Sequence, residues 1–350
     1  MLILVLNPGS TSTRVALYLD GRCLDSKKLS VGADVLDLPL FPEQYEARKR
    51  SVFDYLGDQG LEPSRLDAVA ARGGRLKPLR SGVYRVCPEM VAHAKAGLQG
   101  QHPSNLAVVL AAEIEADYGV PGYTVDPISV DEMSDIAKIT GLKDISRSSL
   151  SHALSMKSVA RKASRALGIK YEKAKLIVAH LGGGGSVSAH LGGRMVDLYN
   201  SDQEGPFAVE RAGGMPSLKL LAYMREKGLS PEAATRKLAH EGGLYSHFGT
   251  RDFEQMVARA ERDPGAKLVL DAYVYQVAKA VSSFLPIFDG AVDAVVFTGG
   301  VVNAPVIRSE LERYLSFIDR LLWYPGEFEM DALEEGVREA LLGLVPVLDY

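Results

Sequence analysis

Cysteine is scarce in this chain of 350 residues, which contains only Cys23 and Cys87. Their wide separation fits neither a metal site nor a redox motif, so we expect buried, reduced thiols in a cytoplasmic protein. Long hydrophobic runs are also lacking, because no apolar stretch approaches the roughly 20 residues of a membrane span. Residues 1–6 are apolar but lead into a turn without a basic flank, which indicates a strand and not a signal peptide.

Basic runs, and basic patches interleaved with aromatic residues, are absent as well. The net charge is −4 and the sequence pI is about 6.0, which argues against a nucleic-acid or anionic-membrane partner. No Gly-Lys-Ser or Gly-Lys-Thr occurs, so a P-loop is excluded. The composition that remains, 47% hydrophobic and 24% charged, is typical of a soluble globular protein, and the length predicts two domains.

A glycine-rich turn between two strand-like runs occurs twice. The first copy has Asn-Pro-Gly-Ser-Thr-Ser-Thr at residues 7–13, and the second has Gly-Gly-Gly-Gly-Ser at residues 182–186. Successive backbone N–H groups in such a turn form a nest that binds anions, and glycine lets a ligand approach closely. A single copy is most often only a hairpin. Two copies predict two half-domains that face the phosphates of a nucleotide from opposite sides.

Strand-like runs alternate with helical periodicity along the chain, which predicts an α/β fold. Helices are expected at residues 105–118 (closed by Gly119), from Ser151 or His152 onward, at 267–287 and at 331–342. A buried strand is expected at 294–301, where Gly299 and Gly300 would let a flat ring lie against the backbone. A domain boundary near residue 150 places one glycine-rich turn in each half.

Further short segments accompany the two turns. They are Arg-Gly-Gly-Arg-Leu-Lys-Pro at 72–78, Asp-Pro at 126–127 with Val-Asp-Glu at 130–132, Ser-His-Ala-Leu at 151–154, Glu-Arg-Ala-Gly-Gly at 210–214, Phe-Thr-Gly-Gly at 297–300 and Tyr-Pro-Gly-Glu-Phe-Glu-Met at 324–330. This ordered set resembles the acetate and butyrate kinase family, within the actin, hexokinase and heat-shock-chaperone superfamily. The short chain, the Asn-Pro-Gly-Ser-Thr-Ser-Thr turn and the Pro-Gly-Glu segment favour the butyrate branch.

The resemblance implies two duplicated actin-like (ribonuclease H-like) domains with an interdomain nucleotide cleft. We expect the first domain at 1–148, completed by 328–350, and the second at 149–327, with a hinge near 144–151 that closes on nucleotide. The implied reaction is transfer of a phosphoryl group from ATP, with Mg²⁺, to butyrate or a branched short-chain acid. We also expect a homo-oligomer, a dimer or higher.

The chemistry of this transfer favours arginine. A carboxylate nucleophile is already ionised and needs no strong base, but an anionic acceptor must approach a polyanionic donor. Arg72 and Arg211 each stand beside a glycine turn and suit this role, although an arbitrary arginine is more often a surface ion pair. His152 occupies the position of a family histidine that contacts the transferring phosphoryl group, or it caps a helix. Asp126 would orient Arg72 or steer Mg²⁺ through water, or it forms an Asp-Pro turn.

The resemblance also implies a set of binding residues. Those expected to contact nucleotide or phosphate are Asn7, Ser10, Ser12, Arg14, His180, Gly182, Gly183, Gly184, Asp252, Phe253, Gly299 and Gly300. His180 is expected to orient its loop rather than to do chemistry. The metal ligands would be Asn7 with Glu329 or, alternatively, Glu327, and a carboxylate that caps a helix is the other interpretation of these glutamates.

Three positions depart from the family pattern. Arg14 replaces a commoner lysine, Ser151 replaces a bulky aromatic residue, and residues 252–254 lack a frequent arginine beside the adenine. The last two leave acyl and nucleotide preference open, so an acetate or propionate kinase remains an alternative. A nucleotide-gated regulator is less favoured, because the first phosphate strand begins at Leu2 without a helix-turn-helix segment. A sugar kinase on this fold is also less favoured. It would need a carboxylate base to activate a hydroxyl acceptor, whereas the arginine pair suits an anionic acceptor better.

Overall fold

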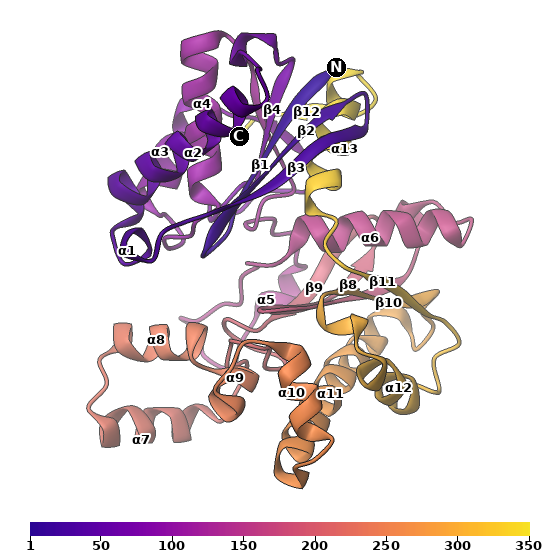
Figure 1. Cartoon of the computed structure of the whole chain (residues 1–350). Coiled ribbons are helices and arrows are strands. Elements are labelled where there is room, and N and C mark those ends of the chain that lie inside the picture. Colours follow the sequence, from indigo (N-terminus) through magenta and orange to yellow (C-terminus); the bar gives the residue numbers. More distant parts are fainter. The chain divides into compact units, whose positions relative to one another are not determined.

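The computed structural model describes residues 1–350, which form two compact units (Figure 1). Unit 1 comprises Met1–Asp131 and Phe328–Tyr350, and unit 2 comprises Glu132–Glu327. The boundary expected at 148/149 therefore falls at 131/132 in the structure. Residues 132–148 pack with unit 2 because the Ser134 amide donates to the Val196 carbonyl over 2.8 Å and Arg147 pairs with Asp197 and Glu204. The expected hinge segment 144–151 thus lies within unit 2.

Unit 1 is built on a seven-stranded sheet with the order β12-β5-β6-β4-β1-β2-β3. Its strands are β1 (Leu2–Pro8), β2 (Ser12–Leu19), β3 (Arg22–Ser30), β4 (Ala68–Ala71), β5 (Val83–Arg85), β6 (Gly122–Val125) and β12 (Val347–Leu348). The first three form an antiparallel meander, and β4 and β6 run parallel to β1. The first glycine-rich turn joins β1 to β2, as predicted.

Helices cover both faces of this sheet. They are α1 (Ala33–Leu36), α2 (Tyr45–Asp58), α3 (Pro88–Ala96), α4 (Asn105–Tyr118) and α13 (Glu329–Leu341), with short helical turns at Leu40–Gln44 and Pro63–Arg65. Figure 1 shows α2, α3 and α4 on one side of the strands and α13 on the other. Helix α4 ends at Gly119, whose φ of 72° is left-handed, as the sequence predicts. Glycine is also required at Gly336, where a Cβ would lie 2.7 Å from a methyl group of Val125.

Unit 2 repeats the topology of unit 1 in a five-stranded sheet with the order β11-β10-β7-β8-β9. Its strands are β7 (Leu176–Leu181), β8 (Gly185–Leu191), β9 (Arg194–Asn200), β10 (Ala294–Gly299) and β11 (Leu321–Pro325). Again the first three strands are an antiparallel meander, and the next two run parallel to the first. The predicted α/β fold with a duplicated core is confirmed.

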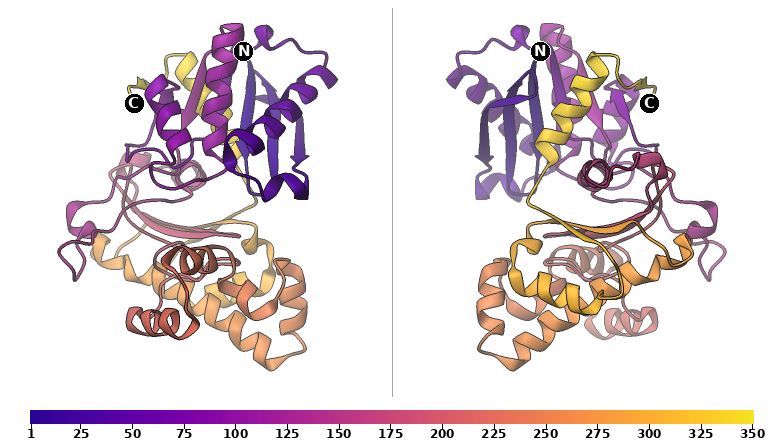
Figure 2. Two further views of the ribbon diagram at one scale, coloured as in Figure 1. Left: turned by 90° about the vertical axis from the view of Figure 1, so that its left-hand side faces the viewer. Right: turned by 90° about the vertical axis from the view of Figure 1, so that its right-hand side faces the viewer.

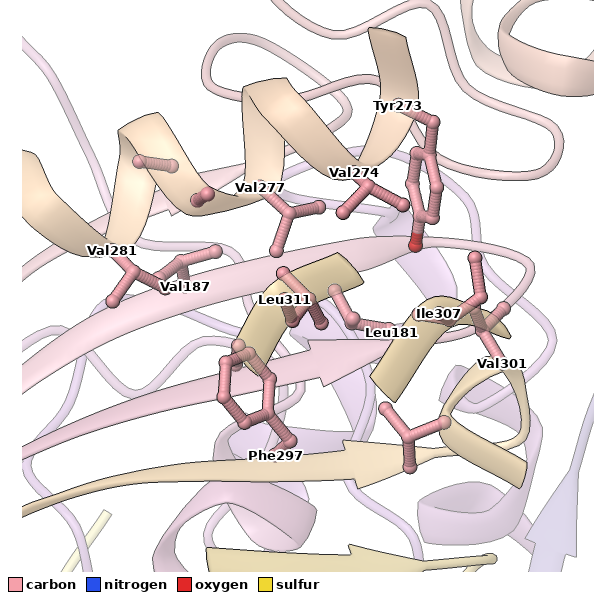
Figure 3. Close-up of a cluster of buried hydrophobic side chains, with 14 of the residues drawn as sticks. Leu181, Val187, Tyr273, Val274, Val277, Val281, Phe297, Val301, Ile307 and Leu311 are labelled. Carbon is pink, nitrogen blue, oxygen red and sulfur yellow. The ribbon is translucent and has the colours of Figure 1, made fainter. Parts of the chain in front are cut away.

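Helix α6 covers one face of the unit 2 sheet, and α9 to α12 cover the other (Figure 2). The helices of this unit are α5 (Asp135–Lys138), α6 (Ala153–Ala166), α7 (Ser217–Lys227), α8 (Pro231–His240), α9 (Gly243–Phe248), α10 (Phe253–Ala260), α11 (Pro264–Ser283) and α12 (Pro305–Tyr314), with short turns at Tyr171–Lys173, Leu285–Phe288 and Val301–Asn303. Valines of α11 such as Val277 and Val281 pack over Val187 and Phe297 of the sheet (Figure 3). This packing holds the strands that end at the second glycine-rich turn.

Two further sequence expectations differ from the structure. The long helix expected at 267–287 spans Pro264–Ser283, because Asp263 caps its first turn and Pro286 cannot continue it. Both cysteines are free, but Cys23 is exposed on the edge strand β3 and Cys87 is half-buried, so the expected burial was wrong. No helix combines the length and the apolar character needed to cross a bilayer.

Candidate functional site

Three predicted site residues of unit 1 lie where parallel strands end. Asn7 is the penultimate residue of β1, Arg72 directly follows β4, and Asp126 directly follows β6. The register pairs Leu6 with Ala71 and Ala71 with Thr124, so Asn7 is level with Arg72 and Asp126 lies one residue further along its strand direction. Ligand sites in open α/β sheets form at such carboxyl ends of parallel strands.

Glu329, the first residue of α13, joins this group. Its Oε2 accepts a hydrogen bond of 2.7 Å from Asn7 Nδ2, and its Oε1 lies 3.4 Å from Arg72 Nη2. Arg72 is only 3% exposed, so contacts within the protein, and not water molecules, surround its guanidinium. Glu327 is exposed and belongs to unit 2. Of the two glutamates considered for the metal, Glu329 is therefore the one that contacts Asn7.

Asp126 is fully buried and has an unusual backbone conformation, with φ of +39°. Its Oδ1 accepts hydrogen bonds from the Ser81 hydroxyl over 2.5 Å and from the Gly82 amide over 2.9 Å. These contacts fix the segment that leads into β5. The structure thus gives Asp126 a role in the geometry of this edge of the sheet.

The first glycine-rich turn is closed by a backbone hydrogen bond and has exposed residues at its tip. The Gly9 amide donates to the Ser12 carbonyl over 2.8 Å and closes the turn. Ser10 is exposed and Ser12 is half-buried, while Arg14 lies opposite Asn7 in the β1–β2 ladder. The amides of Ser10 and Thr11 donate to no acceptor in the protein. These two amides are therefore available to a bound anion, and the predicted phosphate-binding role of the turn stays a prediction.

The second glycine-rich turn is held from behind by residues 208–211. The Glu210 amide donates to the Gly183 carbonyl over 3.0 Å, and the Gly182 amide donates to the Gly184 carbonyl over 3.0 Å. These bonds place Arg211 against the turn, where its Nε lies 2.9 Å from Asp202 Oδ1. A Cβ at Gly184 would lie 2.3 Å from Arg211 Nη1. The missing side chain of Gly184 therefore makes room for the guanidinium.

His152 and His180 lie together in unit 2. Their rings stack with centroids 4.1 Å apart and planes 14° apart. His152 is the N-cap residue of α6 but makes no side-chain cap bond; instead its Nδ1 lies 2.9 Å from the Ser186 hydroxyl. Ser186 is the last residue of the predicted turn and is buried. The second glycine-rich turn, the start of α6 and both histidines thus form one cluster. Within it, the hydrogen bond at Nδ1 fixes the ring of His152.

Gly299 and Gly300 serve different purposes in the structure. A Cβ at Gly299 would lie 2.2 Å from the Leu181 carbonyl oxygen, so close packing of β10 against β7 accounts for this glycine. Gly300 has open space on the side where a Cβ would project, which leaves room for a ligand ring.

Asp252 and Phe253 lie at the start of α10. The Asp252 carboxylate caps this helix, and hydrogen bonds from the Gln255 and Glu254 amides lower its pKa. Phe253 packs against the core of unit 2. Helix capping and core packing thus account for both residues.

Ser151 is buried, and its hydroxyl has no hydrogen-bond partner. A bulky aromatic residue in its place would overpack this region.

Sequence reasoning missed Arg48, Ser186 and Asp202. Ser186 and Asp202 act through contacts with His152 and Arg211 that only the fold creates. Arg48 did leave a signal, because it falls on the apolar face of α2 that includes Tyr45 and Val52. A charged residue on such a face is expected to be buried with specific partners.

The structure contains no cluster of three His, Cys, Asp or Glu side chains that could hold a metal ion by themselves. Asn7 and Glu329 nevertheless offer an amide and a carboxylate, which provide oxygen ligands of the kind Mg²⁺ prefers. Magnesium in nucleotide sites is usually held by one or two carboxylates together with phosphate oxygens and water. The residues present fit a metal bound jointly with a nucleotide.

Comparison with known proteins gives a consistent result. The sequence profile of the Acetokinase family matches residues 143–320. Butyrate kinase 1 of Clostridium acetobutylicum is 39% identical over 352 residues, covering 99% of this chain and 99% of that protein. Probable butyrate kinase 2 of Caldanaerobacter subterraneus subsp. tengcongensis is 38% identical over 343 residues, covering 97% of each.

The fold has a counterpart among solved structures. The crystal structure of Porphyromonas gingivalis acetate kinase superimposes with a TM-score of 0.79 at 21% identity, covering 96% of this chain and 99% of the other. At this identity the likeness concerns the fold alone. This likeness in fold and the full-length sequence identity to the two butyrate kinases agree on the family. The chain belongs to the acetokinase family.

Proposed function

We propose that this protein is a short-chain carboxylate kinase that converts ATP and butyrate, or a branched relative, into ADP and butyryl phosphate. The observation that carries the proposal is the 39% identity, over 99% of both chains, to butyrate kinase 1 of C. acetobutylicum. The local geometry supports it, because each unit combines a glycine-rich turn with an oriented arginine: Arg72, which contacts Glu329, in unit 1 and Arg211, which lies against Gly184, in unit 2.

The proposed reaction is a direct in-line transfer. A carboxylate oxygen attacks the γ-phosphorus, the bond from that phosphorus to the β–γ bridging oxygen breaks, and ADP leaves with the bonding electrons. The acceptor is ionised at neutral pH, so no residue has to remove a proton. The main barrier is the repulsion between the anionic carboxylate and the negatively charged nucleotide phosphates. Arginine lowers this barrier because its planar guanidinium can bind equatorial phosphoryl oxygens through two N–H groups at once.

The unit 2 cluster fits a role in holding the phosphoryl group. Arg211 is oriented by Asp202, and the Ser186 hydroxyl holds Nδ1 of His152, which directs any contact with a phosphoryl oxygen to Nε2. In unit 1, Glu329 orients the buried Arg72 guanidinium. The exposed amides of the first turn and the polypeptide around Gly182 to Gly184 would bind phosphate through N–H groups.

We propose that Asn7 and Glu329 hold Mg²⁺ jointly with a bound ATP. When bound there, Mg²⁺ would neutralise part of the negative charge of the nucleotide phosphates. Glu329→Gln keeps the size of the side chain but removes its charge, so the Mg²⁺ concentration for half-maximal activity should rise by roughly tenfold. The carboxylate KM should change much less.

A magnesium titration of kcat at saturating ATP and butyrate measures this effect. Glu327→Gln is the matched control, since Glu327 is the alternative carboxylate, is exposed and belongs to unit 2. An unchanged titration for Glu329→Gln, or an equal shift for Glu327→Gln, would contradict the assignment.

Trapping acyl phosphate with hydroxylamine tests the proposed function. The series should include straight and branched acids from C2 to C6, with ATP and Mg²⁺. Burial of each additional methylene is worth about 0.8 kcal/mol, or roughly fourfold in kcat/KM, so the preference for butyrate over acetate should be graded. Absence of hydroxamate with every acid would refute the proposal, and a maximum at acetate or propionate would shift it to those kinases.

The proposed partners are small molecules, namely the carboxylate and ATP or ADP, and we place the reaction in the cytoplasm where ATP is supplied. We also propose a homo-oligomer. Helix α7 supports this, because it has no buried residue and exposes Leu218 by 81% and Leu221 by 61% on one face. Unpartnered apolar faces of this kind are typical of surfaces that bind another protein.

Replacing both leucines with glutamate should prevent association through α7. Light scattering after size exclusion should give a dimer or larger assembly for the wild-type protein and a smaller mass for the Leu218→Glu/Leu221→Glu variant. The exposed Leu268 provides a control at a distant helix. A monomeric wild-type protein, or an unchanged mass for the variant, would contradict the proposal.

A further inference from the structure

The backbone carbonyls of residues 8–12, in the first glycine-rich turn, each accept a hydrogen bond from a donor within unit 1. The Pro8 carbonyl accepts from the Ser104 hydroxyl over 3.3 Å, and the Thr11 carbonyl accepts from the Val31 amide over 3.0 Å. The carbonyls of Gly9, Ser10 and Ser12 accept from the guanidinium of Arg48 over 2.9, 3.0 and 3.0 Å. A turn with its carbonyls fixed inward must direct its amides outward, toward an anion.

Arg48 is well suited to this task. It lies on α2, is 3% exposed and uses Nη1 and Nη2 for separate carbonyls, while Gln44 Oε1 accepts a further bond from Nη2 over 3.3 Å. Gln44 in turn donates to the carbonyls of Leu36 and Leu38, which ties the start of the helix to the preceding loop. Arg48 has no carboxylate partner. Its charge therefore acts on the turn and is not neutralised by an ion pair.

The second glycine-rich turn shows by comparison what Arg48 does. There the backbone amides of Val209 and Glu210 donate to the carbonyls of Gly182 and Gly183. No backbone segment donates in this way to Gly9 or Ser10. The side chain of Arg48 takes the place of that segment and adds a positive charge. Burial lowers the pKa of Arg48 to about 10, so the guanidinium remains charged at neutral pH.

We propose that Arg48 is a positioning residue that holds the first glycine-rich turn in its anion-binding conformation and so determines the affinity for nucleotide. The proposal rests on the proposed function, in which this turn binds phosphate. Arg48 itself faces the carbonyls and would act through the amides of Ser10 and Thr11. Its loss should therefore affect nucleotide binding more than the binding of the carboxylate.

The test compares Arg48→Gln, Arg48→Lys and the control Arg50→Gln. Arg50 lies two residues further along α2 and is exposed. For Arg48→Gln, the KM for ATP and the Kd for ADP from titration calorimetry should each rise by about tenfold or more, while the KM for butyrate changes by less than about threefold. Arg48→Lys should recover part of the loss, because lysine keeps the charge but cannot span separate carbonyls.

Circular dichroism and thermal unfolding establish that each variant is folded. If Arg48→Gln does not fold, Arg48→Lys decides the question through its ADP affinity. Unchanged ADP affinity in the folded variants, or equal increases in both KM values, would overturn the inference. Calorimetry with ADP does not require turnover, so this result is distinguishable from a failure of the wild-type protein to form acyl phosphate, which would refute the proposed function instead.

Discussion

Replacing Arg211 with alanine is expected to lower kcat by roughly several hundredfold while the protein stays folded. A positioned positive charge acts on the phosphoryl group in transit, and removal of one such group typically costs about 10²–10³ in kcat or more. The side chain is oriented by Asp202 and lies beside Gly184 in unit 2. The Arg72→Ala variant should show a loss of similar size, because its guanidinium is buried and oriented by Glu329 in unit 1.

Steady-state kinetics with saturating ATP, Mg²⁺ and butyrate measure both variants. Arg262→Ala is the control, because Arg262 is exposed and stands outside every predicted site segment. Arg211→Lys separates charge from shape, and we expect it to recover only part of the rate because an ammonium lacks the planar fork. Near-native kcat for folded Arg72→Ala and Arg211→Ala would contradict the proposed mechanism.

Adding a single methyl group at Gly184 is expected to lower kcat by about ten- to a hundredfold. The new Cβ would lie 2.3 Å from Arg211 Nη1, so the guanidinium must move. It can do so without moving the backbone, because the contact is with the end of a flexible side chain. The fold should therefore survive, while a displacement of about 1 Å at a catalytic group costs roughly a hundredfold in rate.

Gly183→Ala is the matched comparison for Gly184→Ala. Its Cβ would meet Glu210 Oε1 at 3.6 Å, an ordinary contact, so its effect on kcat should be clearly smaller. In a protein that already carries Arg211→Ala, the Gly184→Ala change should lower kcat little further, because the guanidinium that it would displace is absent. Equal effects of the two glycine changes, or full additivity with Arg211→Ala, would show that Gly184 does not act through Arg211.

The sequence was sufficient to predict the local elements that carry the turns. Apolar runs at the chain start and at 176–181 predicted β1 and β7, and the helical period with Gly119 predicted α4 to its last residue. The unit boundary was displaced because the apolar residues of 132–148 do not mark where this segment packs: Ile136, Ile139, Leu142 and Ile145 are exposed. Polar contacts such as those of Arg147 decide its place instead. Periodicity does not report contacts of this kind.

The motif order predicted which residues matter, but not how they contact one another. Asn7 and Glu329 are 322 positions apart in the chain and meet only because α13 returns to the sheet of unit 1. Arg48 escaped notice because no motif includes it and its partners are backbone carbonyls. The reason for glycine at Gly184 is likewise visible only once Arg211 is placed. Such long-range side-chain contacts require the fold.

The central claim is that a carboxylate oxygen attacks the phosphoryl group that ATP supplies from its γ-position and stays bonded to that phosphorus. Phosphorus NMR of the products formed from ATP and butyrate labelled with ¹⁸O in both carboxyl positions tests it. The account predicts ADP as the nucleotide product and an acyl phosphate whose phosphorus signal is shifted by one directly bonded ¹⁸O. Formation of AMP and pyrophosphate, or an acyl phosphate without that isotope shift, would contradict it.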